Sequence, residues 1–500
     1  MALLVELAGR TLALELSGPG RPEPTDGGLL LPPGRAAVLH GMGDALFYRH
    51  GQNSWSPCGW RRLSDPPLRI ADPRRRVTAD DTRWDDPHRH HSSALAALSD
   101  GDGNVLLLGA LGLGTPRCGA DVDTLAGWYE HGGAPWFLGY GPEEEVFASY
   151  TRQLGERLGA RQRRAGNVWC SWYAYYEGVS ETQLAKDIAA LRGLPFDVVQ
   201  IDDGWELAVG DWEPNAKFPS GMAALARRIT DTGLVPGLWL APFIALPGSD
   251  LARRRPELLL RDERGEPVVA GYNWGTGYFA LDLAKPQARE HVAALIQRVV
   301  HEWGFQYLKL DFINGGAVPG ARDGDPDRER VYRDALALVR EVAGDDVYLL
   351  GSGAILLPSL GLLDGLRSGP DVAPMWQNYA SDDPSDAMAR NAVVNAVHRL
   401  WQAPLAEVDP DVIYFRRRLN LLTDQQLDWL RDLADICGFR AVSDPPGWLS
   451  PDEFDSMITY LSRRPRVTRL DRYRYGIDGR VVDFGPAVNP HAPEQLYPIS

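Results

Sequence analysis

The sequence predicts an α/β protein: a (β/α)8 TIM barrel, preceded by an N-terminal β-sandwich domain and followed by a small C-terminal β-domain. From about residue 166, short apolar runs alternate with helical patterns, which is typical of βα units around a parallel sheet. Before about residue 140 and after about residue 465, short alternating runs are broken by Gly, Pro and Asp, which favours antiparallel strands. A chain of 500 residues is also too long for one hydrophobic core.

The first predicted part contains strand-like runs such as TLALEL and NVLLLGALGLG. The next is a helical linker, because Pro142 precedes Glu143, Glu144 and Glu145 and therefore places three acids at the positive end of a helix dipole. The predicted boundaries are 1–140 for the β-sandwich, 141–165 for the linker, 166–465 for the barrel and 466–500 for the C-terminal β-domain.

Eight strands with helices between them are predicted inside the barrel, and the third βα unit carries an insertion over 258–283. Each strand is a short apolar run rich in branched or aromatic residues. The strands are expected near 167–173, 197–202, 235–241, 306–312, 346–351, 363–367, 404–408 and 439–442.

Composition excludes several classes of function. The net charge of −15 argues against nucleic acid and against an anionic membrane as partners, and arginine runs such as 74–76 are expected to be solvated. The four cysteines lack C-x-x-C spacing, so neither a disulfide framework nor a zinc site is predicted. No apolar run reaches the length of a membrane span, and the N-terminus has no cleavage pattern, so a cytoplasmic protein is expected.

The stretch YLKLDF at 307–312 places a lysine and a carboxylate inside an apolar strand. Side chains alternate along a strand, so Lys309 and Asp311 share one face. Taken alone, a buried structural ion pair is the simpler explanation. In a barrel, however, polar residues at the C-terminal ends of strands are candidates for the active site.

Other predicted strands also end in polar or aromatic residues. Carboxylates accept hydrogen bonds from sugar hydroxyls, aromatic rings cover the apolar face of a pyranose, and two carboxylates can cleave a glycosidic bond. A sugar-cleaving site is therefore favoured over a structural ion pair. The residues at these strand ends are Trp172 and Tyr173 (first strand), Asp202 and Asp203 (second), Trp239 (third), Ser352 (fifth), and Arg367 and Asp371 (sixth).

Six motifs carry a family resemblance. They are CSWYAYY at 170–176, QIDDGWE at 200–206, GDWEPNAKFPSGM at 210–222, GLWLAPF at 237–243, YLKLDF and DGLRSGPDVAPMW at 364–376. With these motifs the sequence resembles glycoside hydrolase family 36, the α-galactosidases of the bacterial, melibiase-like type, most strongly from about 167 to 415.

The resemblance implies roles for the catalytic pair. Asp311 would be the nucleophile and Asp371 the general acid/base of a retaining reaction through a glycosyl-enzyme intermediate. Lys309 would favour the ionised form of Asp311 and also donate to sugar hydroxyls. Asp371, facing that negative charge, would keep its proton until the leaving oxygen takes it.

The resemblance also implies which residues bind the sugar. Asp202 and Asp203 would accept from its 4- and 6-hydroxyls. Ser352 stands where related sequences often have Cys, near the 2-substituent, so galactose and N-acetylgalactosamine are not separated. Trp239 would form a wall of the site, and Trp172 and Tyr173 would line it. Arg367 would orient a hydroxyl or Asp371. Trp55 would reach the site from the β-sandwich, although a position in the core of that domain is equally compatible with the sequence.

The expected function is hydrolysis of terminal α-galactose from oligosaccharides, with no metal or organic cofactor and no nucleic-acid or membrane partner. An α-N-acetylgalactosaminidase or an α-galactosyl transglycosylase is the alternative within the family, and association into a homo-oligomer stays open. A non-catalytic sugar-binding protein is disfavoured because both Asp311 and Asp371 are present. A metal-dependent amidohydrolase is disfavoured because the histidines at 88–91 lie well before the barrel.

Overall fold

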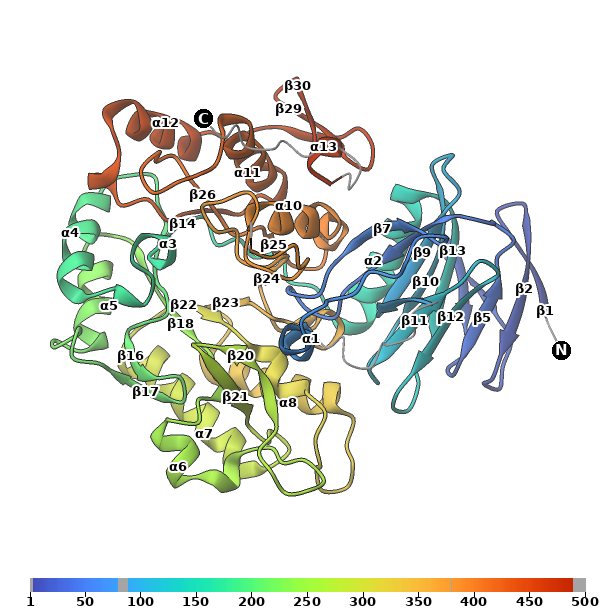
Figure 1. The fold of residues 1–500 in the computed structure, drawn as a ribbon, viewed down its shortest axis with the longest axis horizontal. Coiled ribbons are helices and arrows are strands. Elements are labelled where there is room, and N and C mark those ends of the chain that lie inside the picture. The colour runs from blue at the N-terminus through green and yellow to red at the C-terminus, as the bar shows by residue number, and fades with distance from the viewer. Residues whose placement is uncertain (1–2, 80–88, 379, 489–500) are drawn as a thin grey trace.

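A computed structural model describes residues 3–79, 89–378 and 380–488 (Figure 1). Its N-terminal part contains two antiparallel sheets, in which buried Leu12 and Leu14 alternate with outward residues along β2, the period expected of a strand with one buried face. One sheet orders β1 (Leu3–Leu7), β2 (Arg10–Leu16), β5 (Ala36–Leu39), β12 (Thr124–Tyr129), β11 (Pro116–Ala120) and β8 (His90–Ser93). The other orders β3 (Glu23–Thr25), β4 (Gly28–Leu31), β13 (Trp136–Pro142), β10 (Asn104–Ala110), β9 (Leu95–Ser99), β6 (Leu46–Arg49) and β7 (Gly59–Arg62).

The helix predicted after Pro142 is observed as α2 (Glu143–Leu158), with its three glutamates in the first turn. The helix packs on the second sheet, where the Tyr150 hydroxyl donates to the Ala110 carbonyl at 2.9 Å. Gly109 makes this contact possible, because a Cβ there would lie 2.4 Å from the Tyr150 ring.

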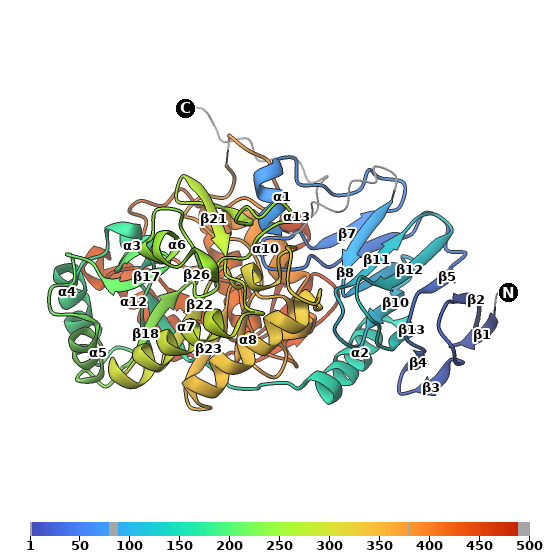
Figure 2. The same cartoon turned by 90° about the horizontal axis from the view of Figure 1, so that it is seen from below.

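A nine-stranded parallel sheet forms the larger part of the molecule (Figures 1 and 2). Its two end strands, β25 and β26, are separated in the chain only by Pro410 and Asp411, so the sheet curls until its ends meet, as in a barrel. Counting β25 and β26 as one broken strand leaves the eight predicted strands, all confirmed in position. The sheet orders β25 (Glu407–Asp409), β24 (Gly365–Arg367), β23 (Tyr348–Gly351), β22 (Tyr307–Leu310), β18 (Val235–Leu240), β15 (Val198–Ile201), β14 (Asn167–Cys170), β27 (Arg440–Val442) and β26 (Val412–Ile413).

Helices with one apolar stripe flank this sheet. In α5 the buried residues Met222, Leu225 and Ile229 follow helical spacing, while Arg227 and Arg228 stay on the outer face. Capping boxes start α11 at Thr423 and α12 at Ser450. The other helices are α3 (Trp172–Tyr175), α4 (Glu181–Leu191), α5 (Met222–Thr230), α6 (Asp250–Arg254), α7 (Pro286–Gln297), α8 (Arg328–Ala343), α9 (Leu356–Ser359), α10 (Ala389–Val397), α11 (Asp424–Cys437), α12 (Pro451–Ser462) and α13 (Gly485–Val488). No helix within the described part of the chain is long and apolar enough to cross a membrane.

Smaller sheets occupy the insertions and the C-terminal part. The predicted insertion forms a hairpin of β20 (Val269–Asn273) and β21 (Thr276–Ala280), joined by β19 (Ile244–Ala245). β16 (Glu206–Ala208) pairs with β17 (Asp211–Pro214), and β28 (Val467–Arg469), β29 (Arg474–Ile477) and β30 (Arg480–Asp483) form the C-terminal sheet. Residues 489–500 of the predicted C-terminal domain lie outside the described residues, and the predicted domain boundaries stay a prediction.

A segment of the N-terminal part is anchored on the barrel. The Arg399 guanidinium donates to the carbonyls of Asn53 and Ser56 at 2.8 and 2.9 Å. The short helix α1 (Pro73–Ala79) follows this segment and packs against β20 (Figures 1 and 2). These contacts bring residues from the first 80 positions to the rim of the parallel sheet.

Candidate active site

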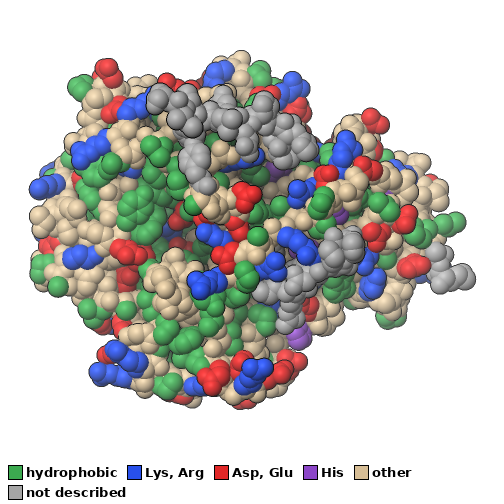
Figure 3. Space-filling view, in the orientation of Figure 1, with side chains coloured by type: hydrophobic (Ala, Val, Ile, Leu, Met, Phe, Trp, Pro, Cys, Tyr) green, Lys and Arg blue, Asp and Glu red, His purple; other side chains and the backbone are tan. Residues whose placement is uncertain are grey.

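A cavity of about 390 Å³ opens at the C-terminal end of the parallel sheet. In the space-filling view, acidic and basic side chains gather among hydrophobic ones near the centre of this face (Figure 3). The inner wall contains Trp172, Asp202, Asp203, Trp239, Lys309, Asp311 and Asp371, and the outer wall contains Trp55, Asp72, Arg74, Arg75, Thr78, Tyr272, Asn273, Phe312, Pro370, Ser385, Asp386 and Ala387. Seven of the eleven predicted site residues thus meet on the inner wall, and an eighth, Trp55, borders it.

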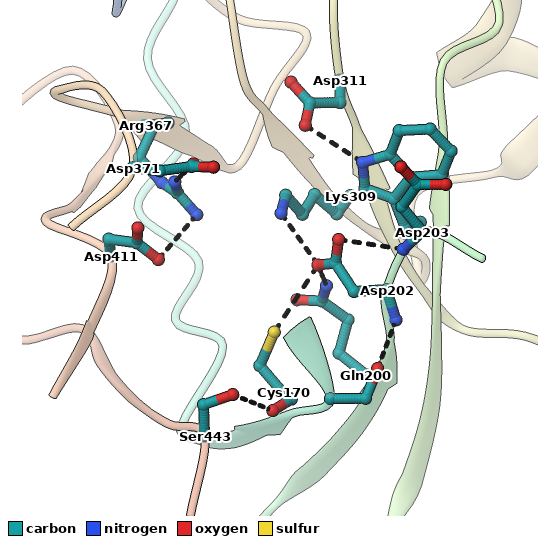
Figure 4. Close-up of polar contacts among 12 residues, drawn as sticks. Cys170, Gln200, Asp202, Asp203, Lys309, Asp311, Arg367, Asp371, Asp411 and Ser443 are labelled. Atoms are coloured by element: carbon teal, nitrogen blue, oxygen red, sulfur yellow. Dashed lines mark hydrogen bonds and ion pairs between the residues drawn. The ribbon is translucent and has the colours of Figure 1, made fainter. Parts of the chain in front are cut away.

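A buried ion pair stands at the centre of the site (Figure 4). Lys309 Nζ lies 2.8 Å from Asp202 Oδ2, which also accepts from Gln200 Nε2 at 2.5 Å and Cys170 Sγ at 3.5 Å. Burial opposes the charge on Lys309, but the Asp202 carboxylate, together with Asp311 and Cys170, raises the pKa of the lysine above its usual value. The partner bonded to Lys309 is therefore Asp202, two strands away, and not the Asp311 expected from YLKLDF.

Asp311 is held by an indole and by the backbone. Trp239 Nε1 donates to its Oδ2 at 3.0 Å, and the Phe312 amide donates to its Oδ1 at 2.9 Å. Phe312 has φ +51°, a left-handed conformation that is strained for a bulky residue by about 1–3 kcal/mol. Its ring stacks on Trp55 with centroids 5.0 Å apart, and it also contacts Trp274. The strained turn therefore presents the Asp311 carboxylate in one orientation.

Three carboxylates surround Arg367, and two of them, Asp371 and Asp411, are labelled in Figure 4. The guanidinium contacts Asp409 Oδ2 through Nε at 2.8 Å, Asp411 Oδ1 through Nη2 at 3.1 Å and Asp371 Oδ1 through Nη1 at 3.2 Å. The Asp371 side chain, 40% exposed toward the cavity, is the most accessible of the three. Desolvation and the Asp411 charge raise the pKa of Asp371 to about 6, against the opposite effect of Arg367. Asp371 is therefore protonated below about pH 6 and loses its proton above it.

Asp203 has a separate set of partners. Trp274 Nε1 donates to its Oδ2 at 2.8 Å, which ties the hairpin β20–β21 to the inner wall. Burial raises the pKa of Asp203, and the neighbouring Glu206 carboxylate raises it further, since two buried carboxylates in contact do not both ionise readily. The pair of Asp203 and Glu206 therefore favours a state that keeps one proton.

Three predicted binding residues lie behind the cavity wall. Tyr173 is buried and donates its hydroxyl to Asp411 at 2.6 Å, so it supports the wall instead of lining it. Ser352 is also buried and does not line the cavity, whereas Trp55 does. The Trp55 ring packs closely on the neighbouring Gly353, where a Cβ would lie 2.3 Å from the ring. Arg367 reaches the cavity only through its contact with Asp371.

Sequence reasoning missed several residues of the outer wall. The arginine run 74–76 was expected to be solvated, and Arg74 is exposed; Arg75, however, pairs with Asp386 at 2.7 Å, and Arg74 lies over the Tyr272 ring at 5.4 Å. Arg74 and Arg75 reach the cavity wall because α1 packs against β20. The spacing of the arginines in the sequence did not predict this position. The GYNWGTGY stretch around Trp274 is aromatic and glycine-rich, a pattern that could have indicated a wall of the site.

No group of three or more potential ligands is arranged to hold a metal ion in the part of the chain that the structure describes. His90 and His91 are buried in β8, and His90 Nε2 is within 3.2 Å of the Leu63 carbonyl. His88 lies outside the described residues.

The chain is similar to known proteins. A protein-family model described as Melibiase matches residues 145–343. This chain is 42% identical to TtGalA, an α-galactosidase from Thermus thermophilus. TtGalA has been solved in complex with p-nitrophenyl α-D-galactopyranoside and, separately, with stachyose. With the first complex the TM-score is 0.91, over 97% of this chain and 100% of that chain.

Two further comparisons involve AgaA of Geobacillus stearothermophilus. The solved GH36 α-galactosidase AgaA shares the fold, with a TM-score of 0.59 and 16% identity over 86% of this chain and 63% of that chain. The AgaA sequence is 28% identical over 184 residues, which are 34% of this chain and 24% of the relative. The chain thus aligns with about a quarter of the length of that curated relative.

Proposed function

Because the chain belongs to glycoside hydrolase family 36, the α-galactosidases, we propose that it hydrolyses terminal α-D-galactosyl residues of oligosaccharides by a retaining double displacement. The observation that carries the proposal is the pair Asp311 and Asp371, which border one cavity together with the Lys309–Asp202 ion pair (Figure 4). The TtGalA complexes with an α-galactoside and with stachyose support the substrate class.

In the proposed first step, Asp311 attacks the anomeric carbon and forms a glycosyl-enzyme ester. Trp239 Nε1–H and the Phe312 amide fix the attacking carboxylate, so little reorientation is needed. As the glycosidic bond breaks, Asp371 gives its proton to the leaving oxygen. Its raised pKa supports this role, because an ordinary aspartate would be almost fully ionised near neutral pH.

In the second step, the ionised Asp371 removes a proton from water. The water oxygen attacks the anomeric carbon and displaces Asp311, so two inversions give net retention. In the proposed complex, Lys309, Asp202 and Asp203 bind hydroxyls of the same galactosyl unit, and their place around one cavity supports this role. Asp202 accepts a hydrogen bond from Lys309, whereas burial and the Glu206 carboxylate raise the pKa of Asp203, so the two carboxyls offer different hydrogen-bonding capacity.

The outer wall supplies contacts for the second sugar. Tyr272 lines the cavity with 42% of its surface exposed, and an exposed ring at the mouth of a polar cavity is suited to stacking on a pyranose. We expect Tyr272→Ala to raise KM for raffinose roughly threefold to tenfold. Because α-galactosyl fluoride has no second sugar, its kcat/KM should stay at the wild-type value.

Tyr272→Phe is the matched control for this prediction. It keeps the ring and removes only the hydroxyl, so its KM for raffinose should stay close to wild type. Equal losses on raffinose and on the fluoride in Tyr272→Ala would contradict a contact with the second sugar.

The proposed function is tested by hydrolysis of p-nitrophenyl α-galactoside beside its 2-acetamido analogue, with and without a chelator. Faster turnover of the galactoside, insensitive to the chelator, is the expected result. Preference for the 2-acetamido substrate would instead favour an α-N-acetylgalactosaminidase, and galactosyl transfer to added sugar, seen by product analysis, would favour a transglycosylase. Inactivation by the chelator would overturn the proposed mechanism.

A further inference from the structure

Asp411 occupies the point where the parallel sheet closes, between β25 and β26. It is buried, with 2% of its surface exposed, and its φ of +79° lies in the left-handed region that few residues other than Gly, Asn and Asp adopt. Its amide donates to Asp409 Oδ1 at 2.7 Å. An aspartate therefore stands where glycine would be unstrained, which indicates that its carboxylate has a function.

That carboxylate joins three segments. Tyr173, after β14, donates its hydroxyl to Asp411 Oδ2 at 2.6 Å, and the Val372 amide donates to the same oxygen at 2.8 Å. Arg367, on β24, contacts the other oxygen at 3.1 Å. Because Val372 directly follows Asp371, Asp411 holds the backbone that carries Asp371. Figure 4 shows Asp411 beside Arg367 and Asp371.

Asp411 also determines how much positive charge Asp371 meets. Arg367 contacts Asp409, Asp411 and Asp371, so its single charge is divided among three carboxylates. Removal of the Asp411 charge leaves more of that cation for Asp371 and removes a like charge nearby. Both effects favour the ionised form of Asp371. Other titratable groups also face Asp371. They are Lys309 on β22, Asp311 directly after β22, and Tyr173 and Tyr176 after β14.

We propose that Asp411 is a positioning residue that holds Asp371 at the cavity and keeps its proton available for the leaving oxygen. This inference rests on the proposed function, in which Asp371 is the general acid. The proton passes from the Asp371 carboxyl to the glycosidic oxygen as the bond to the anomeric carbon breaks. Asp411 itself exchanges no proton and does not border the cavity.

The variant Asp411→Asn tests the charge. Asparagine has the same shape, accepts the Val372 amide and tolerates a positive φ. We expect the alkaline limb of kcat/KM for melibiose, which reports loss of the Asp371 proton, to move down by on the order of one pH unit. Above that limb this shift corresponds to about a tenfold loss of activity. The fluoride ion of α-galactosyl fluoride leaves with less need of a proton, so kcat/KM for that substrate should change little.

The variant Asp411→Gly removes both the charge and the hydrogen bonds, and glycine adopts this φ without strain. It should show the same shift of the limb with a further fall in kcat for melibiose, and it serves as the test if Asp411→Asn does not fold. Tyr173→Phe removes one donor but keeps the charge, so its limb should stay within a few tenths of a unit. Thermal unfolding checks that each variant is folded.

The inference would be overturned if both Asp411 variants kept the alkaline limb of kcat/KM for melibiose at its wild-type pH and kept the wild-type ratio of activity on melibiose to activity on α-galactosyl fluoride. The proposed function would stay intact in that case. Equal losses on both substrates with no shift of the limb would also overturn it, since they indicate a purely structural role. If the wild-type protein hydrolyses neither galactoside, the proposed function itself fails, and the inference fails with it.

Discussion

Asp311→Ala is expected to lower kcat for p-nitrophenyl α-galactoside by about four orders of magnitude or more, because no other group can form the glycosyl-enzyme bond. The Asp311 carboxylate is fixed by Trp239 and by the Phe312 amide at the cavity wall. The substitution empties that position without removing a buried ion pair. The variant should therefore unfold near the wild-type temperature, and the rate loss would reflect chemistry.

Azide distinguishes the roles of the two carboxylates. Added to Asp311→Ala, it should restore turnover and give β-galactosyl azide, the product of a single inversion. Asp371→Ala is the matched variant: its glycosyl-enzyme still forms with a good leaving group, and azide should give α-galactosyl azide. Wild-type activity in Asp311→Ala, or the same azide anomer from both variants, would contradict the assignment.

The second large effect is expected at Asp202. Asp202→Ala leaves Lys309 buried without its bonded partner, and we expect a loss of about 3–5 kcal/mol in the free energy of unfolding. Activity on galactosides should fall as well, since the same carboxylate borders the cavity. Denaturant unfolding monitored by tryptophan fluorescence measures the stability.

A double-mutant cycle separates the ion pair from packing. Lys309→Met removes the buried cation, so adding Asp202→Ala to Lys309→Met should cost clearly less than Asp202→Ala alone. Asp202→Asn keeps the shape and one acceptor oxygen, and should lie between wild type and the alanine variant. Additive losses in the cycle would show that the two side chains are not coupled.

The amino-acid sequence alone predicts the parts of this protein that depend on local pattern. Apolar runs bounded by turn residues located all eight barrel strands, because strands buried on both faces require continuous apolar segments. The same pattern located polar residues at strand ends, so Asp202, Lys309 and Asp311 could be assigned to one rim. The three glutamates after Pro142 located α2 through the helix dipole.

Which of these side chains bond to one another depends on tertiary structure. Two residues apart in YLKLDF, Lys309 and Asp311 share a face, yet the closed sheet brings Lys309 to Asp202 and leaves Asp311 to Trp239. Inward side chains of alternate strands lie in one layer of a barrel. The spacing of residues along one strand does not show which side chains of other strands share that layer. The partners of a buried charge are therefore determined by closure of the sheet.

The outer wall and Asp411 show the same limit over longer separations. Trp55 and Arg75 reach the cavity because Arg399 anchors the segment around Trp55, ahead of α1, on the barrel. Sequence pattern left Trp55 equally compatible with a core position. Asp411 contacts Tyr173 across 238 residues, at the point where the last strands meet the first. The sequence by itself determined the elements and the residue types at their ends. Only the folded chain decided which of them meet, because such contacts depend on how distant segments pack.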